Sequence, residues 1–160
     1  TSQCRMPKAE GFALEKLGRI EEAEEAYGQA ILLGEDAPVE SAAAFHNRGI
    51  LRRLRGDLVE ALDVLERSFS LWSQAGSHHE EQAKTLDNLL HLYAQFGNYH
   101  LALARTRRLD LSFFSLDSKA RLLTRLAEIY RGKGDLEDAE SHAKGALQFR
   151  LQEGDLKGAA

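Results

Sequence analysis

Histidine is the residue type in this sequence with the most chemical potential, because the imidazole ring binds metals and moves protons near neutral pH. The chain has six histidines, and the only cluster is His78-His79-Glu80. Adjacent residues at a helix start point about 100° apart, so this pair does not easily share one ligand sphere. No further ligand follows at a recognisable metal spacing. We therefore expect no metal site.

A glycine-rich segment, Gly132-Lys133-Gly134-Asp135, is the second candidate for chemistry. A phosphate-binding loop needs a preceding strand and the order Gly-Lys-Ser/Thr, and both are missing here. Cys4 is the only cysteine and has no motif around it. Acidic pairs such as Glu137/Asp138 recur at expected helix starts instead of forming an isolated catalytic pair. We expect neither catalysis nor a cofactor.

The glycine-rich segment has a simpler explanation, because the chain repeats it. Each copy has a glycine, a polar or charged residue, an apolar residue, two further residues and an alanine. The four glycines are Gly18, Gly56, Gly97 and Gly134, at spacings of 38, 41 and 37 residues. A period in this range is typical of stacked supersecondary units.

Each copy is predicted to be a helix hairpin. In the last copy an apolar face precedes the glycine; its members are Leu122, Leu123, Leu126, Ile129 and Tyr130. Gly134 is predicted to end this helix in the left-handed conformation, and Asp135 to N-cap the next. Small residues on the second helix, such as Ala139 and Ala143, allow the two helices to approach closely. A single hairpin cannot bury its apolar side alone.

The pattern resembles the tetratricopeptide repeat, whose signature combines W-x2-L-G-x2-Y with A-x3-F. The second-helix step occurs as Ala23/Tyr27, Ala61/Leu65, Ala102/Thr106 and Ala139/Ala143. First-helix positions occur as Phe45 and Gly49, as Leu86, Leu89 and Tyr93, and as Leu123, Leu126, Ala127 and Tyr130. The period exceeds the family's 34 residues, which is similar to the long-repeat variety in signalling and regulatory proteins.

The resemblance implies an all-α fold, a right-handed α-solenoid of about four hairpins and about eight antiparallel helices. We expect one domain over residues 1–160. Its repeats are predicted at 4–37, 38–76, 77–115 and 116–153, and 154–160 resembles the start of a further repeat. The second helix of the third copy is predicted to end early, because Ser112 and Ser115 favour a turn. We hypothesise a piece of a longer protein, or a chain capped by another copy of itself.

Composition restricts the classes of function. The formal net charge is −4 and the isoelectric point is about 5.9, which argues against direct nucleic-acid binding. A single cysteine excludes an internal disulfide and favours a reducing, cytoplasmic location. The sequence has neither an 18-residue apolar run nor a signal peptide, so we expect no membrane association.

By resemblance, the first helices line a concave groove that binds peptides or partner helices. The candidate groove residues are Lys8, Phe12, His46, Asn47, Ile50, Lys84, Asn88, His91, Arg121 and Arg125. Some family members clamp a terminal carboxylate with Lys and Asn on successive first helices. Two sets of residues fit that pattern in part: Lys8, Asn47 and Lys84, and Asn88, Arg121 and Arg125.

Charge is unevenly distributed along the chain. Residues 105–133 include eight Lys/Arg and three Asp/Glu, whereas residues 8–40 include three and nine. This pattern fits a partner with an acidic segment near the third and fourth repeats, or self-association; solubility alone would also explain it. The leading hypothesis is a protein-interaction module. The alternatives are a sensor segment of a bacterial transcriptional or signalling regulator and a self-associating structural scaffold, with an enzyme ranked last.

Overall fold

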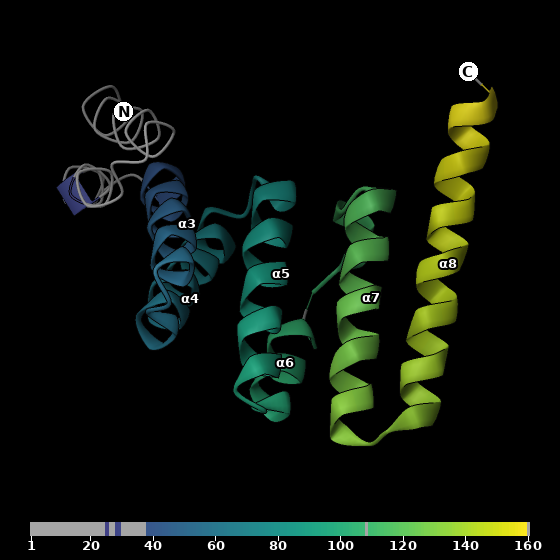
Figure 1. Cartoon of the computed structure of the whole chain (residues 1–160). Coiled ribbons are helices and arrows are strands. Elements are labelled where there is room, and N and C mark those ends of the chain that lie inside the picture. The colour runs from purple at the N-terminus through teal and green to yellow at the C-terminus, as the bar shows by residue number, and fades with distance from the viewer. Residues whose placement is uncertain (1–24, 26–27, 30–37, 108, 160) are drawn as a thin grey trace. The chain divides into compact units, whose positions relative to one another are not determined.

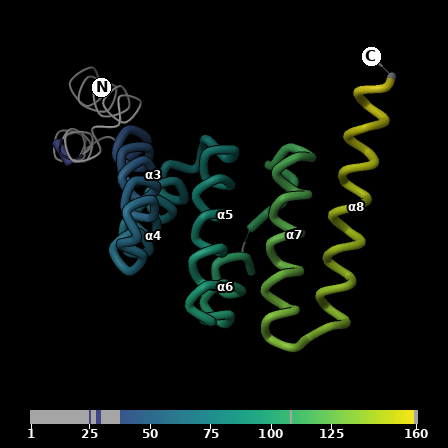
Figure 2. Tube along the Cα trace, in the orientation of Figure 1, coloured from purple at the N-terminus to yellow at the C-terminus, as the bar shows by residue number. Residues whose placement is uncertain are grey.

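The structure is a computed structural model that describes residues 25, 28–29, 38–107 and 109–159 (Figure 1). The chain divides into two compact units, residues 1–85 and 86–160, so that the division falls within one helix. The helices are α3 (Pro38–Leu54), α4 (Leu58–Ala75), α5 (His79–Gln95), α6 (Tyr99–Thr106), the 3₁₀ turn η1 (Leu111–Phe113), α7 (Leu116–Lys133) and α8 (Leu136–Ala159) (Figure 2).

The part of the chain described by the structure is all-helical and has six α-helices and no strand. The expected count of about eight helices is therefore not matched. The other two were predicted within residues 1–33, most of which lie outside the described residues. None of the described helices, α3 to α8, combines the length and apolar character needed to cross a lipid bilayer.

The predicted glycine turn is confirmed in its clearest copy. Gly134 ends α7 with φ +95°, and its N–H points to the carbonyls of Tyr130 and Arg131. This left-handed conformation is cheap only for glycine. The carbonyl of Asp135 accepts the N–H of Ala139 at 3.0 Å, as an N-cap residue's does, while its carboxylate lies 3.2 Å from Lys133 Nζ. The repeat signal therefore marks hairpin turns and no phosphate loop at this position.

In the first unit α3 packs against α4 at very short range. Gly49 faces Leu65, and a Cβ added at Gly49 would lie 2.5 Å from Leu65 Cγ. The Leu65 side chain is fully buried, together with Leu51 and Ala61. Ser68, also fully buried, donates a hydrogen bond from Oγ to the carbonyl of Ala42 at 2.7 Å. The missing side chain at position 49 lets the two helices pack this closely.

In the second unit α7 packs against α8, and α6 also contacts α7. The buried apolar residues of this unit include Leu89, Leu92, Leu103, Leu126, Ile129 and Ala146. Tyr99, the first residue of α6, lies over Gly132, where an added Cβ would be 2.6 Å from the phenol oxygen. A small residue again sets the distance between two helices.

The early end of the third copy's second helix is confirmed. Helix α6 has eight residues, and the Thr106 hydroxyl donates to the carbonyl of Leu103 at 2.8 Å. Asp110 accepts hydrogen bonds from the backbone N–H and the hydroxyl of Ser112. Ser115 Oγ caps α7 by accepting the N–H of Ser118 at 3.2 Å. Short polar side chains thus replace the helical hydrogen bonds in this segment.

The last helix runs past the predicted end of the fourth repeat. That repeat was predicted at residues 116–153, and α8 continues as one helix to Ala159. Ion pairs one turn apart join Arg150 to Glu153 at 3.6 Å and Lys157 to Glu153 at 3.4 Å. These pairs support helical geometry through the segment that resembled the start of a further repeat.

Replacing Gly49 with alanine should destabilise the first unit. Alanine favours helix by about 1 kcal/mol over glycine, but overpacking a core costs about 1–3 kcal/mol. The second effect should dominate, because Leu65 is fully buried and cannot move aside. We expect Gly49→Ala to lower the free energy of unfolding, measured by urea denaturation.

Gly154→Ala is the matched control, because no atom lies within 4 Å of a Cβ added at Gly154. It should leave stability unchanged or raise it. Equal effects of the two substitutions would contradict the close packing of Gly49 against Leu65.

Candidate functional site

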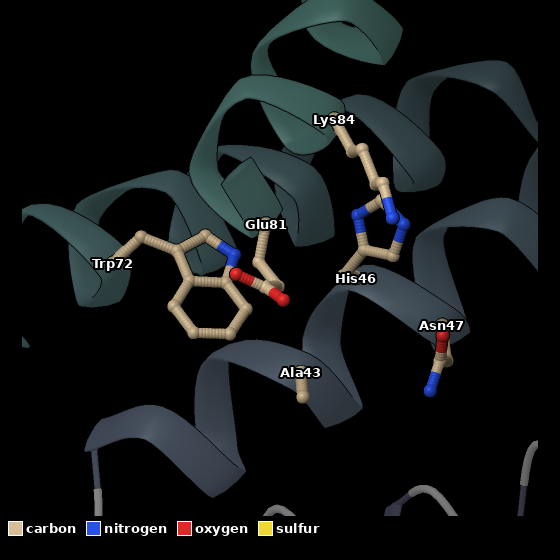
Figure 3. Close-up of a pocket in the computed structure, with 6 residues that line it drawn as sticks. All are labelled: Ala43, His46, Asn47, Trp72, Glu81 and Lys84. Atoms are coloured by element: carbon tan, nitrogen blue, oxygen red, sulfur yellow. The ribbon is translucent and has the colours of Figure 1, made fainter. Parts of the chain in front are cut away.

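The first unit contains a partly open hollow of about 230 Å³ between α3, the end of α4 and the start of α5 (Figure 3). Its lining residues are Ala43, His46, Asn47, Trp72, Glu81 and Lys84. Ala43 and the edge of the buried Trp72 give it an apolar part. Glu81 and Lys84 are exposed and bring opposite charges to its rim.

A fully buried threonine, Thr85, holds the walls of the hollow together. Its hydroxyl accepts a hydrogen bond from Trp72 Nε1 at 3.0 Å and donates to the carbonyl of Glu81 at 3.2 Å. His46 Nδ1 lies 2.9 Å from the same oxygen. One side chain of α5 therefore connects α3 and α4, and a buried network of this kind fixes side-chain positions when all its members are paired.

These contacts define which nitrogen of His46 carries the proton. A hydroxyl has one proton and two acceptor sites. Thr85 uses its proton on the Glu81 carbonyl, and Trp72 can only donate. His46 must therefore donate through Nδ1–H if all three hydrogen bonds form, so the neutral ring keeps Nε2 as an acceptor. Protonation would add a second N–H, on Nε2, and a full charge.

The environment of His46 disfavours that charge. Burial lowers the pKa of His46 from 6.5 to about 4, helped by the nearby positive charges of Lys84 and Arg53. His46 is consequently neutral near physiological pH. Its role in the hollow is that of an uncharged hydrogen-bonding group.

The structure brings together three of the predicted groove residues. His46 and Asn47 on α3 and Lys84 on α5 all line the hollow. Ile50 is half-buried on α3 and does not line it. Lys8 and Phe12 lie outside the described residues, so the first of the two predicted carboxylate sets is described only at Asn47 and Lys84.

In the second unit, the predicted groove residues His91 and Arg125 belong to an ion-pair cluster. Arg125 donates from Nε to Asp87 at 3.1 Å and from Nη1 to Glu128 at 3.0 Å. Nη1 also lies 3.0 Å from His91 Nδ1, which must accept because a guanidinium only donates. Burial acts against the charged guanidinium, but hydrogen bonds and charges from Asp87 and Glu128 outweigh it and raise the pKa of Arg125.

Arg121 is also paired within its own unit. It forms an ion pair with Asp117 one turn away on α7, and Arg150 from α8 approaches the same carboxylate at 2.5 Å. Hydrogen bonds from Arg150 and Arg121 lower the pKa of Asp117. Asn88 is half-buried on α5. Arg121 and Arg125, the arginines of the second predicted carboxylate-binding set, are thus already paired with carboxylates of the protein. These pairs compensate part of the local excess of basic residues.

In the His78-His79-Glu80 cluster, the first residue packs against its neighbours. His78 has φ +57°, stacks on Trp72 with ring centroids 5.8 Å apart, and lies within hydrogen-bond distance of Ser77 Oγ at 2.8 Å. Among the residues that the structure describes, no three His, Cys, Asp or Glu side chains are grouped to hold a metal ion.

Sequence reasoning missed three residues at the hollow: Trp72, Glu81 and Thr85. Trp72 is a buried residue of α4, and its Nε1–H also needs a buried acceptor. The available signal was Thr85 itself, a polar residue between Ala83 and Leu86 on the apolar side of the predicted helix. A buried threonine requires partners, and those partners define the site.

Comparison with known proteins identifies the family. Residues 40–108 match one sequence profile described as the tetratricopeptide repeat, and residues 10–35 and 120–152 match a second profile of the same description. The chain belongs to the tetratricopeptide repeat family, with glycine spacings of 37 to 41 residues. No curated protein sequence matches the chain.

Solved structures with the same fold include three that are distant in sequence. BtubC (BKLC) from P. vanneervenii has a TM-score of 0.74 and 16% identity, covering 94% of this chain and 64% of its own. MamA has a TM-score of 0.75 and 19% identity, and the match covers 95% of this chain and 81% of the MamA chain. The third structure holds TPR-like repeats of a putative kinesin light chain from Podosopora anserina. It has a TM-score of 0.70 and 16% identity, and the match covers 95% of this chain and 77% of that chain. The chain spans less than two thirds of BtubC, and these identities show a shared fold alone.

The free energy of unfolding should decrease as the pH is lowered from 6.5 to 4, because of His46. Its pKa is lowered in the folded state, so the unfolded chain binds the proton more readily over that interval. The loss should reach at most about 3 kcal/mol. Urea unfolding at several pH values across the interval would measure it.

A His46→Gln variant should show a flatter pH dependence than the wild type. His100→Gln is the control, since His100 is exposed on α6. If both variants keep the wild-type slope, His46 does not contribute to the pH dependence.

The Asp87–Arg125 pair should contribute measurably to the second unit. Both side chains are about a quarter exposed, so water screens the pair less than an open surface pair. A double-mutant cycle with Asp87→Asn and Arg125→Gln should give a coupling of about 1 kcal/mol. The exposed pair Asp63–Arg67 is the control and should give about half of that or less. Equal couplings would contradict the difference in burial.

Proposed function

We propose that this chain is a protein-interaction module that binds a peptide or a segment of a partner protein in the hollow of the first unit. The tetratricopeptide repeat generally mediates protein–protein interaction. The observation that carries the proposal is the convergence of His46, Asn47 and Lys84 from two successive first helices around one hollow.

The size of the hollow suits one side chain or one chain terminus. Its volume of about 230 Å³ is below the range of roughly 300–1,000 Å³ typical of small-molecule sites. The apolar part beside Ala43 and Trp72 can receive a hydrocarbon portion. The rest of a bound segment would extend over the neighbouring first-helix surface.

The charges at the rim favour one acidic group on the ligand. Lys84 can pair with a carboxylate, and the Asn47 amide can donate a second hydrogen bond to it. Glu81, on the same rim, repels a second negative charge nearby. The proposed ligand therefore carries a single acidic side chain or a free carboxylate, next to an apolar group.

We propose further that the site acts by binding and not by catalysis. His46 is neutral, and its Nδ1–H and the Thr85 hydroxyl are engaged in the network that holds the helices. A general base needs its proton acceptor close to a reacting group, with a pKa near the working pH. The lowered pKa of His46 makes it a weak base in this position.

Selection of peptides from a random display library, followed by fluorescence polarisation of the enriched peptides, would test the proposal. The variants Lys84→Ala and Asn47→Ala should each weaken binding, the lysine variant by at least about tenfold. Raising the salt concentration should weaken binding to the wild type and have less effect on Lys84→Ala.

Lys157→Ala is the control, because Lys157 is an exposed lysine on α8. It should bind as the wild type does. The proposal is wrong if no peptide is enriched, or if Lys84→Ala and Lys157→Ala bind the peptides equally.

A further inference from the structure

The two ring nitrogens of His46 have different surroundings. Nδ1 lies 2.9 Å from the hydroxyl oxygen of Thr85, which also accepts the indole N–H of Trp72 and donates to the carbonyl of Glu81. Nε2, on the opposite side of the ring, forms no hydrogen bond with any residue that the structure describes. The ring is half-buried and lines the hollow, so Nε2 is the nitrogen left for a bound ligand.

The protonation state of His46 decides what Nε2 can bind. In the neutral ring the proton resides on Nδ1, and Nε2 presents a lone pair that attracts hydrogen-bond donors. A carboxylate only accepts, so its oxygens are repelled by that lone pair. Protonation reverses the preference, because Nε2–H then donates and a charge-assisted hydrogen bond to a carboxylate is stronger than a neutral one.

The charges around the ring keep His46 neutral in the absence of an acidic ligand. Burial is the largest cause of its lowered pKa, and the positive charges of Lys84 on α5 and Arg53 on α3 lower it further. The Lys84 side chain extends toward the imidazole (Figure 3). Among the described lining residues Glu81 is the one carboxylate, and it is exposed on the rim, while α4 contributes the uncharged Trp72.

A carboxylate bound at Lys84 changes these conditions. It compensates the charge of the lysine and brings a negative charge to the same side of the hollow as the imidazole. An opposite charge within about 4–6 Å favours the charged form of a titratable group, typically by about 1–3 pH units. Binding is reciprocal, so a ligand that favours protonation of His46 is itself bound more tightly when the proton is present.

We propose that the hollow takes up a proton together with an acidic ligand and that the proton adds to Nε2 of His46. The proton comes from the solution and joins the lone pair, so no other covalent bond forms or breaks. The new N–H joins the Lys84 ammonium as a second cationic donor to the carboxylate. This inference rests on the proposed function of the hollow, and it makes His46 a specificity-determining residue whose preference depends on pH.

NMR titration of the whole chain with two small probes would test this inference. N-acetyl-leucine has an apolar side chain and a free carboxylate, and N-acetyl-leucinamide has an uncharged amide in place of the carboxylate. Each is titrated at about pH 7 and about pH 5, where a terminal carboxyl group of pKa about 3.5 stays ionised. The dissociation constant of N-acetyl-leucine should be at least about twofold lower at the acidic pH, and that of the amide should not change.

The ring nitrogens of His46 provide a direct readout in the unmodified protein. Long-range nitrogen–proton spectra recorded through a pH titration give the midpoint at which Nε2 is protonated. With saturating N-acetyl-leucine this midpoint should rise from about 4 by at least about one pH unit, and with the amide it should stay where it is. This measurement involves no substitution, so it does not depend on the folding of a variant.

His46→Gln should remove the pH dependence of N-acetyl-leucine binding. Glutamine can still donate a hydrogen bond to Thr85, but it does not titrate. His78→Gln is the control, because His78 stacks on Trp72 and also carries an imidazole near the hollow. Whatever its affinity, this variant should keep the wild-type ratio between the two pH values.

Four results would overturn the inference. They are N-acetyl-leucine that binds at neither pH, equal binding at both pH values, an unchanged midpoint of His46, and a pH dependence that survives in His46→Gln. The proposed function is judged separately, by the peptides enriched from the display library. Peptides that bind at neutral pH and lose affinity in Lys84→Ala support that function even where the proton is not taken up.

Discussion

Close approach of paired helices is the constraint on which the rest of this structure depends. Gly49 against Leu65 sets the spacing of α3 and α4, and Gly132 beneath Tyr99 does the same for α6 and α7. Helices that pack at this distance bury their backbones and leave the polar first-helix residues at the surface. The hollow lies beside this packing, and the hydrogen bond from Trp72 on α4 to Thr85 on α5 joins two of its walls.

The hollow shows how one polar residue can fix the side chains around it. Thr85 lies among buried apolar residues of α5 such as Ala83 and Leu86. Its hydroxyl fixes the indole of Trp72 and the ring of His46. Fixed side chains lose less conformational entropy on binding, which strengthens the binding of a ligand. A threonine in the core therefore contributes to the proposed site as well as to the fold.

Charge compensation explains why a basic stretch of sequence need not give a basic surface. Residues 105–133 have an excess of Lys and Arg. Yet Arg121 shares Asp117 with Arg150, and Arg125 holds Asp87 and Glu128. One of these carboxylates, Asp87, lies 38 residues before Arg125 and outside the basic stretch. Local charge counts ignore such partners, so they overestimate the positive potential that an acidic ligand would meet.

The sequence by itself determined the family, the all-helical fold, the hairpin turns at Gly56, Gly97 and Gly134 and the early end of α6. All these depend on local patterns: helical periodicity, the backbone freedom of glycine and short polar side chains that cap helices. Only the tertiary structure decided that His46, Asn47 and Lys84 share one hollow while Arg121 and Arg125 are held by carboxylates. The physical reason is that hydrogen bonds and ion pairs between helices depend on side-chain distances, which a one-dimensional pattern does not contain.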